Sequence, residues 1–240
     1  MKKNYLLRRT LFLLTFLALT ISWLFVNPAS YETEVENLSS AEETSANLLA
    51  SEVLEKLEVK GRAPKTGYTR DQFYSSWPIV DGCSLRQRII RREMGETAVL
   101  SSENDCDVIS GEFDEPYTGA NLVFSQKSDF SKGIQIDHVV ALSDAWQKGA
   151  QNLSKEERYS LATDPLNLLA VESKANQEKS DGDAATWLPK NKKFRCQYIA
   201  RQISVKYKYH LWVSSAEKSA METVLETCPT EPAVGISLGS

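Results

Sequence analysis

An acid and a histidine stand side by side in an apolar segment of this sequence, and two asparagines follow at a distance. Asp137 and His138 lie within Ile136–Val140, and His138 is one of only two histidines in the chain. Asn167 opens a second apolar run, and Asn176 lies in the polar stretch just after that run. A two-stranded hairpin followed by a helix would bring these three pieces together around one point.

The chemistry that these side chains suit is the hydrolysis of a phosphodiester bond. Asp137 and the side-chain carbonyl of Asn176 are oxygen donors of the kind that Mg²⁺ binds while it keeps several waters, and Mn²⁺ is the second candidate metal. The imidazole of His138 is an efficient base for a water proton near neutral pH. Asn167 could hold the loop between the two strands and so orient the His138 ring.

The adjacency of Asp137 and His138 sets a geometric condition, because neighbouring residues of a regular strand point to opposite faces. The two side chains serve one site only if the strand ends or bulges there, or if the phosphate lies between them. The sequence leaves these options open.

The elements that must position these residues can be read from hydrophobic spacing and from turn residues. Around the motif we expect a strand from Ile134, a helical insertion over 143–161, a strand over 166–171 and a helix from Ser173. The other expected elements are a capped helix from Ser40 to Gly61, a helix over 83–94, strands over 98–100, 107–110 and 121–124, helices over 194–209 and 216–227, and a loose tail over 229–240.

The first 44 residues have the composition of a leader and a tether. Residues 1–30 carry four basic residues and no acid, and the uncharged run Leu11–Val26 follows the basic ones. This layout predicts either a cleaved signal peptide or a retained membrane anchor, with an extracytoplasmic protein (secreted, or anchored to the outer face of the plasma membrane) in both cases. Residues 31–44 form an acidic tether, which leaves 45–228 as the domain.

The four cysteines support export, because an even number downstream of such a leader favours disulfides. Three pairings are open for Cys83, Cys106, Cys196 and Cys228. We favour Cys83–Cys106 and Cys196–Cys228, since the members of each pair are near in sequence.

The charge of the whole chain hides a basic segment. The formal net charge is −4, and the average composition is that of an ordinary globular protein. Residues 184–216, however, contain seven Lys and Arg and no acid. Such a segment favours a nucleic-acid partner, DNA first and RNA second. The candidate phosphate contacts are Lys190, Lys192, Lys193, Arg195, Arg201 and, one helical turn after Asn176, Lys179.

The order Asp-His, Asn-Leu-Leu and Asn-x-x-Lys, carried by Asp137-His138, Asn167 and Asn176–Lys179, resembles the HNH (ββα-metal) endonucleases. More narrowly, the chain is similar over about 45–228 to exported HNH proteins related to the C-terminal domain of GmrSD-type restriction endonucleases. The resemblance implies an α+β fold with a ββα-metal core and divalent-metal-dependent cleavage of nucleic acid. It implies that Asp137 and Asn176 bind the metal, that His138 is the general base and that Asn167 is the middle asparagine of the motif.

Two alternatives to a DNA endonuclease stay open. The first is a non-catalytic extracellular module that binds nucleic acid or an envelope polymer. The second is a ribonuclease or nuclease toxin. No protein partner is inferred, and the membrane is a partner only through an uncleaved N-terminal segment. Sequence-nonspecific cutting is expected, because no separate DNA-reading module such as a helix-turn-helix is visible.

Overall fold

The computed structural model describes residues 47–125 and 133–237. The expected leader (1–30), the acidic tether (31–44) and the capping box at 40–43 lie outside these described residues. Within the described ranges, no helix combines the length and the apolar character that crossing a bilayer requires.

The fold is of the mixed α+β class with short antiparallel strands, as expected. Its elements in chain order are β1 (Asn47–Leu49), α3 (Ala50–Leu54), η1 (Arg70–Gln72), β2 (Ile79–Val80), β3 (Cys83–Ser84), α4 (Leu85–Met94), η2 (Gly95–Thr97), β4 (Val99–Leu100), β5 (Val108–Asp114), β6 (Asn121–Phe124), β7 (Ile134–His138), α6 (Leu142–Gln147), η3 (Ala150–Asn152), α7 (Lys155–Thr163), β8 (Leu168–Glu172), α8 (Ser173–Lys179), η4 (Lys192–Phe194), α9 (Arg195–Lys208), α10 (Ser215–Leu225) and β9 (Pro232–Ser237).

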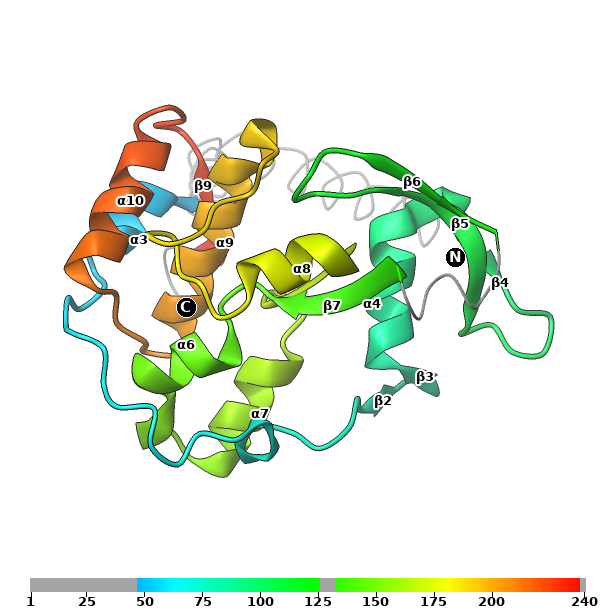
Figure 1. Ribbon diagram of the computed structural model, residues 1–240, viewed down its shortest axis with the longest axis horizontal. Coiled ribbons are helices and arrows are strands. Elements are labelled where there is room, and N and C mark those ends of the chain that lie inside the picture. Colours follow the sequence, from blue (N-terminus) through cyan, green and yellow to red (C-terminus); the bar gives the residue numbers. More distant parts are fainter. Residues whose placement is uncertain (1–46, 126–132, 238–240) are drawn as a thin grey trace, which may run out of the picture. The chain divides into compact units, whose positions relative to one another are not determined.

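The expected hairpin and helix are present as β7, β8 and α8. The strands pair antiparallel without a bulge, so Asp137 lies opposite Leu169 and His138 lies opposite Leu168. Both α4 and α8 pack against this hairpin (Figure 1). The helical insertion between the strands contains α6, η3 and α7.

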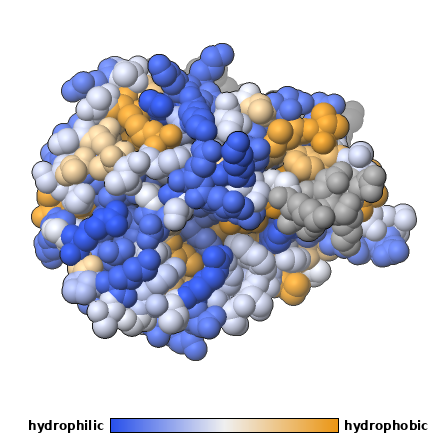
Figure 2. All heavy atoms as spheres, in the orientation of Figure 1, coloured by the Kyte–Doolittle hydropathy of each residue, from blue (hydrophilic) through white to orange (hydrophobic). Residues whose placement is uncertain are grey.

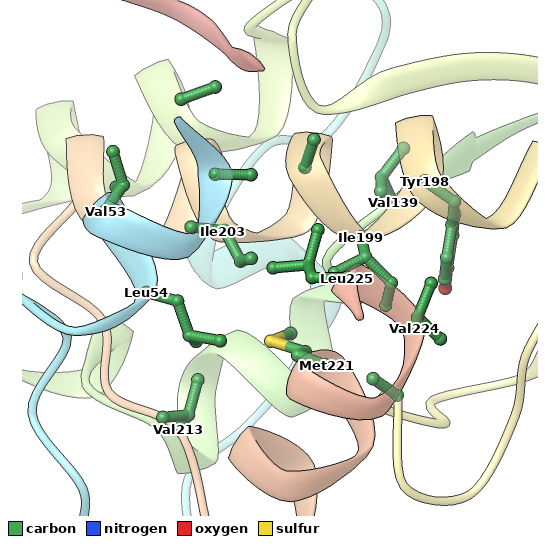
Figure 3. Close-up of a cluster of buried hydrophobic side chains, with 14 of the residues drawn as sticks. Val53, Leu54, Val139, Tyr198, Ile199, Ile203, Val213, Met221, Val224 and Leu225 are labelled. Atoms are coloured by element: carbon green, nitrogen blue, oxygen red, sulfur yellow. The ribbon is translucent and has the colours of Figure 1, made fainter. Parts of the chain in front are cut away.

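The hairpin is buried between two core clusters, which explains why β8 is an unbroken apolar run rather than an alternating one. Leu168 and Ala170 pack in a cluster with α4 and β5. Leu169 and Val171 pack in a second cluster with side chains of α3, α9 and α10. Figure 3 shows part of this second cluster, in which Ile199 and Ile203 of α9 lie near Met221 and Leu225 of α10.

Local sequence signals explain where several helices begin and end. Ser154 and Ser214 cap α7 and α10, and in each case the glutamate three residues later completes a capping box. Helix α4 ends at Gly95, whose φ of 57° lies in the left-handed region that glycine adopts without strain.

Two expected elements differ from the structure where β1 and β9 pair with each other. Of the helix expected from Ser40 to Gly61, the described residues form only Ala50–Leu54, and Asn47–Leu49 directly before it forms β1, which pairs with β9. The expected loose tail contains β9, where Ala233 is buried and the Val234 amide donates to Ser204 Oγ at 2.9 Å. The composition of 229–240 predicts a loop, but a partner strand so far away in sequence leaves no local signal.

Both favoured disulfides are confirmed. Cys83–Cys106 joins the segment before α4 to the loop between β4 and β5. Cys196–Cys228 joins the first turn of α9 to the end of α10. The loops that they close, 23 and 32 residues long, correspond to a stabilisation of about 3–4 kcal/mol each.

Candidate active site

A cleft of about 370 Å³ runs along the outer edge of β7. In the described part of the chain β7 is hydrogen-bonded to β8 on one side only, and residues 135–138 all line the cleft. The two faces of the strand therefore open into one space, and β7 ends at His138. This answers the geometric condition, because Asp137 and His138 reach the same cleft from opposite faces. Asn176 of α8 lines it too.

The Asp137 carboxylate is held from two sides. Lys179 Nζ donates to Oδ1 at 2.9 Å, and the Tyr117 hydroxyl donates to Oδ2 at 2.5 Å. The side chain is 6% exposed. Burial raises the pKa of Asp137, and the charge of Lys179 and the hydrogen bond from Tyr117 act against that rise. A backbone hydrogen bond from His138 also lowers the pKa of this carboxyl.

The His138 imidazole is fixed by a hydrogen bond and by aromatic rings. Its Nε2 lies 2.9 Å from the carbonyl oxygen of Ala162. Because a carbonyl only accepts, Nε2 carries the proton, and Nδ1 of the neutral ring is the acceptor. The Trp77 ring stacks on the imidazole, with an interplanar angle of 9°. Burial lowers the pKa of His138 to about 3, so the ring is neutral at physiological pH.

The side chain of Asn167 is hydrogen-bonded to the segment after β7 and to the last turn of α7. The side chain is fully buried, and its Oδ1 accepts from the Val140 amide at 2.8 Å. Its Nδ2 donates to the Leu161 carbonyl at 3.2 Å. That carbonyl directly precedes the one that His138 contacts. Asn167 therefore ties the end of β7 to the last turn of α7, where the acceptor of the His138 proton lies.

Asn176 lines the cleft and has an amide group held by one hydrogen bond. Its Nδ2 donates to Gln135 Oε1 at 2.7 Å, which fixes the orientation of the amide group. Among the described residues, no donor is hydrogen-bonded to Asn176 Oδ1. Asp137 and Asn176 thus offer two oxygen donors, and within the described chain Asp137 belongs to no cluster of three or more His, Cys, Asp or Glu ligand atoms. This donor set fits a hard divalent cation that keeps most of its waters, such as Mg²⁺.

The six basic residues expected to contact nucleic acid do not line this cleft. Lys179 differs most from the expectation, because it is buried and also donates to the His138 carbonyl at 2.8 Å. Arg201 is half-buried and donates to the Leu168 carbonyl at 3.4 Å. Arg195 donates to the carbonyl of Pro189, Lys190 pairs with Glu178, and Lys192 and Lys193 are exposed.

The cations that do line the cleft come from a segment before α4. Lys65 and Arg70 both lie on its wall, and Lys65 Nζ is 3.2 Å from Asp181 Oδ2. A hydrogen bond from Ser143 and the contact with Lys65 lower the pKa of Asp181. Hydrophilic side chains gather over α8 and its surroundings (Figure 2). Neither cation belongs to the Asp-His and Asn motif, so the motif alone could not single them out.

Comparison with known proteins relates more than half of the chain to one family. The family model described as "GmrSD restriction endonucleases, C-terminal domain" matches residues 85–224, a range that contains the hairpin and α8. The chain is 37% identical over 182 residues to an "Uncharacterized secreted protein" of Arthroderma benhamiae, across 75% of this chain and 84% of that protein. No solved structure matches. The family points to a nuclease-related role. The chain therefore belongs to the family of GmrSD restriction endonuclease C-terminal domains.

Proposed function

We propose that this protein is an HNH-type endonuclease that hydrolyses phosphodiester bonds of DNA with the help of a divalent metal ion and without sequence specificity. One observation carries the proposal. A base (His138) and two oxygen donors (Asp137 and Asn176) line one cleft on a strand-strand-helix unit. The buried Asn167 side chain supports the proposal. It is hydrogen-bonded to the Leu161 carbonyl, next to the Ala162 carbonyl that accepts the His138 proton, and a general base must be held in one orientation.

His138 is the proposed general base. With the Nε2 proton committed to the Ala162 carbonyl, the lone pair of Nδ1 accepts a proton from the attacking water. The hydrogen bond and the stacked Trp77 ring restrict the imidazole, so the direction of that lone pair is set before substrate arrives. The proton taken from water gives an imidazolium whose Nε2–H still donates to the same carbonyl.

Asp137 and Asn176 are the proposed metal ligands. Mg²⁺, or Mn²⁺ in its place, would stabilise negative charge on the phosphate and on the leaving oxygen. Lys179 and Tyr117 each donate to one oxygen of Asp137, so the orientation of the carboxylate is set by the protein. Gln135 does the same for the amide of Asn176.

The proposed location is outside the cytoplasm, either secreted or anchored to the outer face of the plasma membrane. The similar protein of Arthroderma benhamiae is named as secreted. Two disulfides, typical of proteins that fold in oxidising compartments, support the same location. The proposed partner is DNA, with RNA as the second substrate, and no protein partner is proposed.

The test is digestion of supercoiled plasmid, single-stranded DNA and RNA by the full chain, with Mg²⁺, with Mn²⁺ and with EDTA. We expect cleavage of DNA in both metals and none in EDTA. His138→Asn should lower the rate by about 10²–10⁴-fold, because asparagine has no group that takes a proton from water.

The matched control for this test is His210→Asn. His210 is exposed and has a φ of 52°, a conformation that asparagine tolerates, so its replacement should leave the rate unchanged. Cleavage that persists in EDTA or in a folded His138→Asn variant would contradict the proposed mechanism. Binding without cleavage would favour the non-catalytic module, and cleavage of RNA alone would favour the ribonuclease.

A further inference from the structure

A segment that precedes the matched family region contributes Arg70 to the lining of the cleft and packs Tyr74 and Trp77 against the His138 ring. Residues 70–77 lie outside 85–224, the range of the family model. The segment is anchored to the rest of the fold, because Phe73 is buried in the cluster with Trp146 and Leu161, and the Gln72 carbonyl accepts from Arg158 Nε at 3.0 Å. It therefore presents a preformed surface to His138.

We propose that residues 70–77 complete the active site, with Arg70 binding a phosphate group of the substrate next to His138 and Trp77 positioning the His138 ring. The inference deepens the proposed function and rests on it. Arg70 is assigned a contact with substrate, whereas Trp77 acts through His138.

Arg70 has the properties of a phosphate ligand. It lines the cleft together with His138, it is exposed, and no carboxylate in the described residues is paired with it. The other cation on this wall, Lys65, is paired with Asp181. The Arg70 guanidinium lies 5.1 Å from the centre of the Tyr74 ring and donates to the Tyr74 hydroxyl. A guanidinium that Tyr74 holds in place and that has no carboxylate partner among the described residues is suited to bind the oxygens of a phosphate.

Trp77 and Tyr74 restrict the plane of the His138 ring. The Trp77 ring is nearly parallel to the imidazole, with centroids 6.1 Å apart, and the Tyr74 ring lies 5.8 Å away at 48°. The hydrogen bond to Ala162 fixes one nitrogen but leaves the ring free to rock about that contact. The Trp77 and Tyr74 rings remove this freedom, which holds the imidazole in one plane.

The Arg70 assignment is tested by binding without catalysis. A fluorescent single-stranded oligonucleotide is titrated with the full chain in EDTA, and its dissociation constant is measured by anisotropy at several salt concentrations. We expect Arg70→Met to raise the dissociation constant about tenfold and to lower the slope of log K against log salt by about one.

Arg91→Met is the matched control. Arg91 is an exposed arginine of α4 that borders a different hollow, beside Cys106. Its replacement removes the same charge from the molecule. The assignment would be overturned if Arg70→Met bound like wild type, if Arg91→Met lost as much affinity, or if the wild-type chain did not bind the oligonucleotide.

The Trp77 assignment is tested by steady-state kinetics on the same oligonucleotide in Mg²⁺. Trp77→Ala should lower kcat about 10–100-fold with KM nearly unchanged, and Trp77→Phe should recover most of the loss, because a flat ring is restored. Circular dichroism checks that both variants are folded. A change in KM alone, or a folded Trp77→Phe variant as slow as Trp77→Ala, would contradict the assignment.

A labelling experiment separates failure of this inference from failure of the proposed function. Diethyl pyrocarbonate modification, followed by mass spectrometry, reports how accessible each histidine is, whether or not the protein cleaves DNA. His138 should react far more slowly than the exposed His210 in wild type, and Trp77→Ala should bring the two rates together. Unchanged protection of His138 in Trp77→Ala would overturn the role of Trp77 even in an active enzyme.

Discussion

At the scale of single residues, the candidate site depends on buried side chains that are hydrogen-bonded to Asp137. Lys179 and Tyr117 hold Asp137, and each is fully or almost fully buried. An ammonium group placed in this way compensates the carboxylate charge that burial would otherwise make costly. Lys179 is therefore a supporting residue of the site and differs in kind from an exposed lysine that contacts phosphate.

This assignment predicts a large effect of Lys179→Met on stability. The substitution leaves the buried Asp137 carboxylate with Tyr117 as its remaining side-chain partner, so the free energy of unfolding should fall by about 3–5 kcal/mol. Urea denaturation followed by circular dichroism measures it. Lys190→Met is the control, because Lys190 forms an exposed pair with Glu178, and the loss there should be below about 1 kcal/mol. Equal, small losses in both variants would refute the buried pairing.

At the scale of elements, the position of His138 depends on the loop that connects α7 to β8. Besides the side-chain bonds of Asn167, its backbone carbonyl accepts from the Val139 amide at 2.8 Å. The end of β7, the last turn of α7 and the start of β8 are thus joined by one residue. The two neighbouring carbonyls of Leu161 and Ala162 receive Asn167 and His138 respectively.

Asn167→Ala should therefore damage both stability and cleavage. The change leaves the buried Val140 amide and Leu161 carbonyl without their partners, and we expect a loss of about 2–4 kcal/mol in the free energy of unfolding. The Ala162 carbonyl, which accepts the hydrogen bond from His138, lies next to the Leu161 carbonyl that Asn167 contacts. The substitution should therefore change the orientation of His138, and kcat should fall even under conditions where the variant is fully folded. Urea titration and single-turnover cleavage measure the two effects. A stable variant with full activity would show that Asn167 does not position His138.

At the scale of the whole molecule, a buried cluster of charges joins parts of the chain that are distant in sequence. Lys148 Nζ contacts Asp144, Asp183 and Glu217 within 2.8 Å. Lys206 of α9 contacts Asp144 and Glu217, and Arg62 contacts Asp144 and Asp183. Three acids and three cations thus connect α6, α9, α10 and two loops.

The cluster predicts how stability depends on pH. Burial raises the pKa of Asp183, but hydrogen bonds from Lys148 and Arg62 outweigh it, so the pKa lies below its usual value. The carboxylate therefore stabilises the fold above pH of about 4, the unfolded value, and this contribution is lost as pH falls towards the folded pKa. Asp183→Asn should cost about 3 kcal/mol at pH 7 and progressively less below pH 4.

Urea denaturation of both proteins between pH 7 and pH 3 measures this difference. Asp81→Asn is the control, because Asp81 is exposed and pairs with exposed Arg88, and its loss should stay within about 0.5 kcal/mol at every pH. A difference between wild type and Asp183→Asn that stays constant down to pH 3 would contradict the linkage.

The amino-acid sequence by itself determined the local features of this protein. Hydrophobic spacing and turn residues located the hairpin strands, α4, α9 and α10 to within a few residues, because such signals are local in the sequence. The motif of Asp137, His138, Asn167 and Asn176 was visible for a similar reason, since chain order and spacing define it. The short separations of the cysteines also favoured the disulfides that the structure contains.

Only the tertiary structure decided which residues become neighbours. The pairing of β1 with β9, the burial of Lys179 against Asp137, and the packing of Tyr74 and Trp77 against His138 all join segments far apart in the chain. The sequence around a lysine does not show whether its ammonium group is exposed to water or paired with a buried carboxylate. The difference lies in which partner the packed core brings to it, and that is a property of the whole fold.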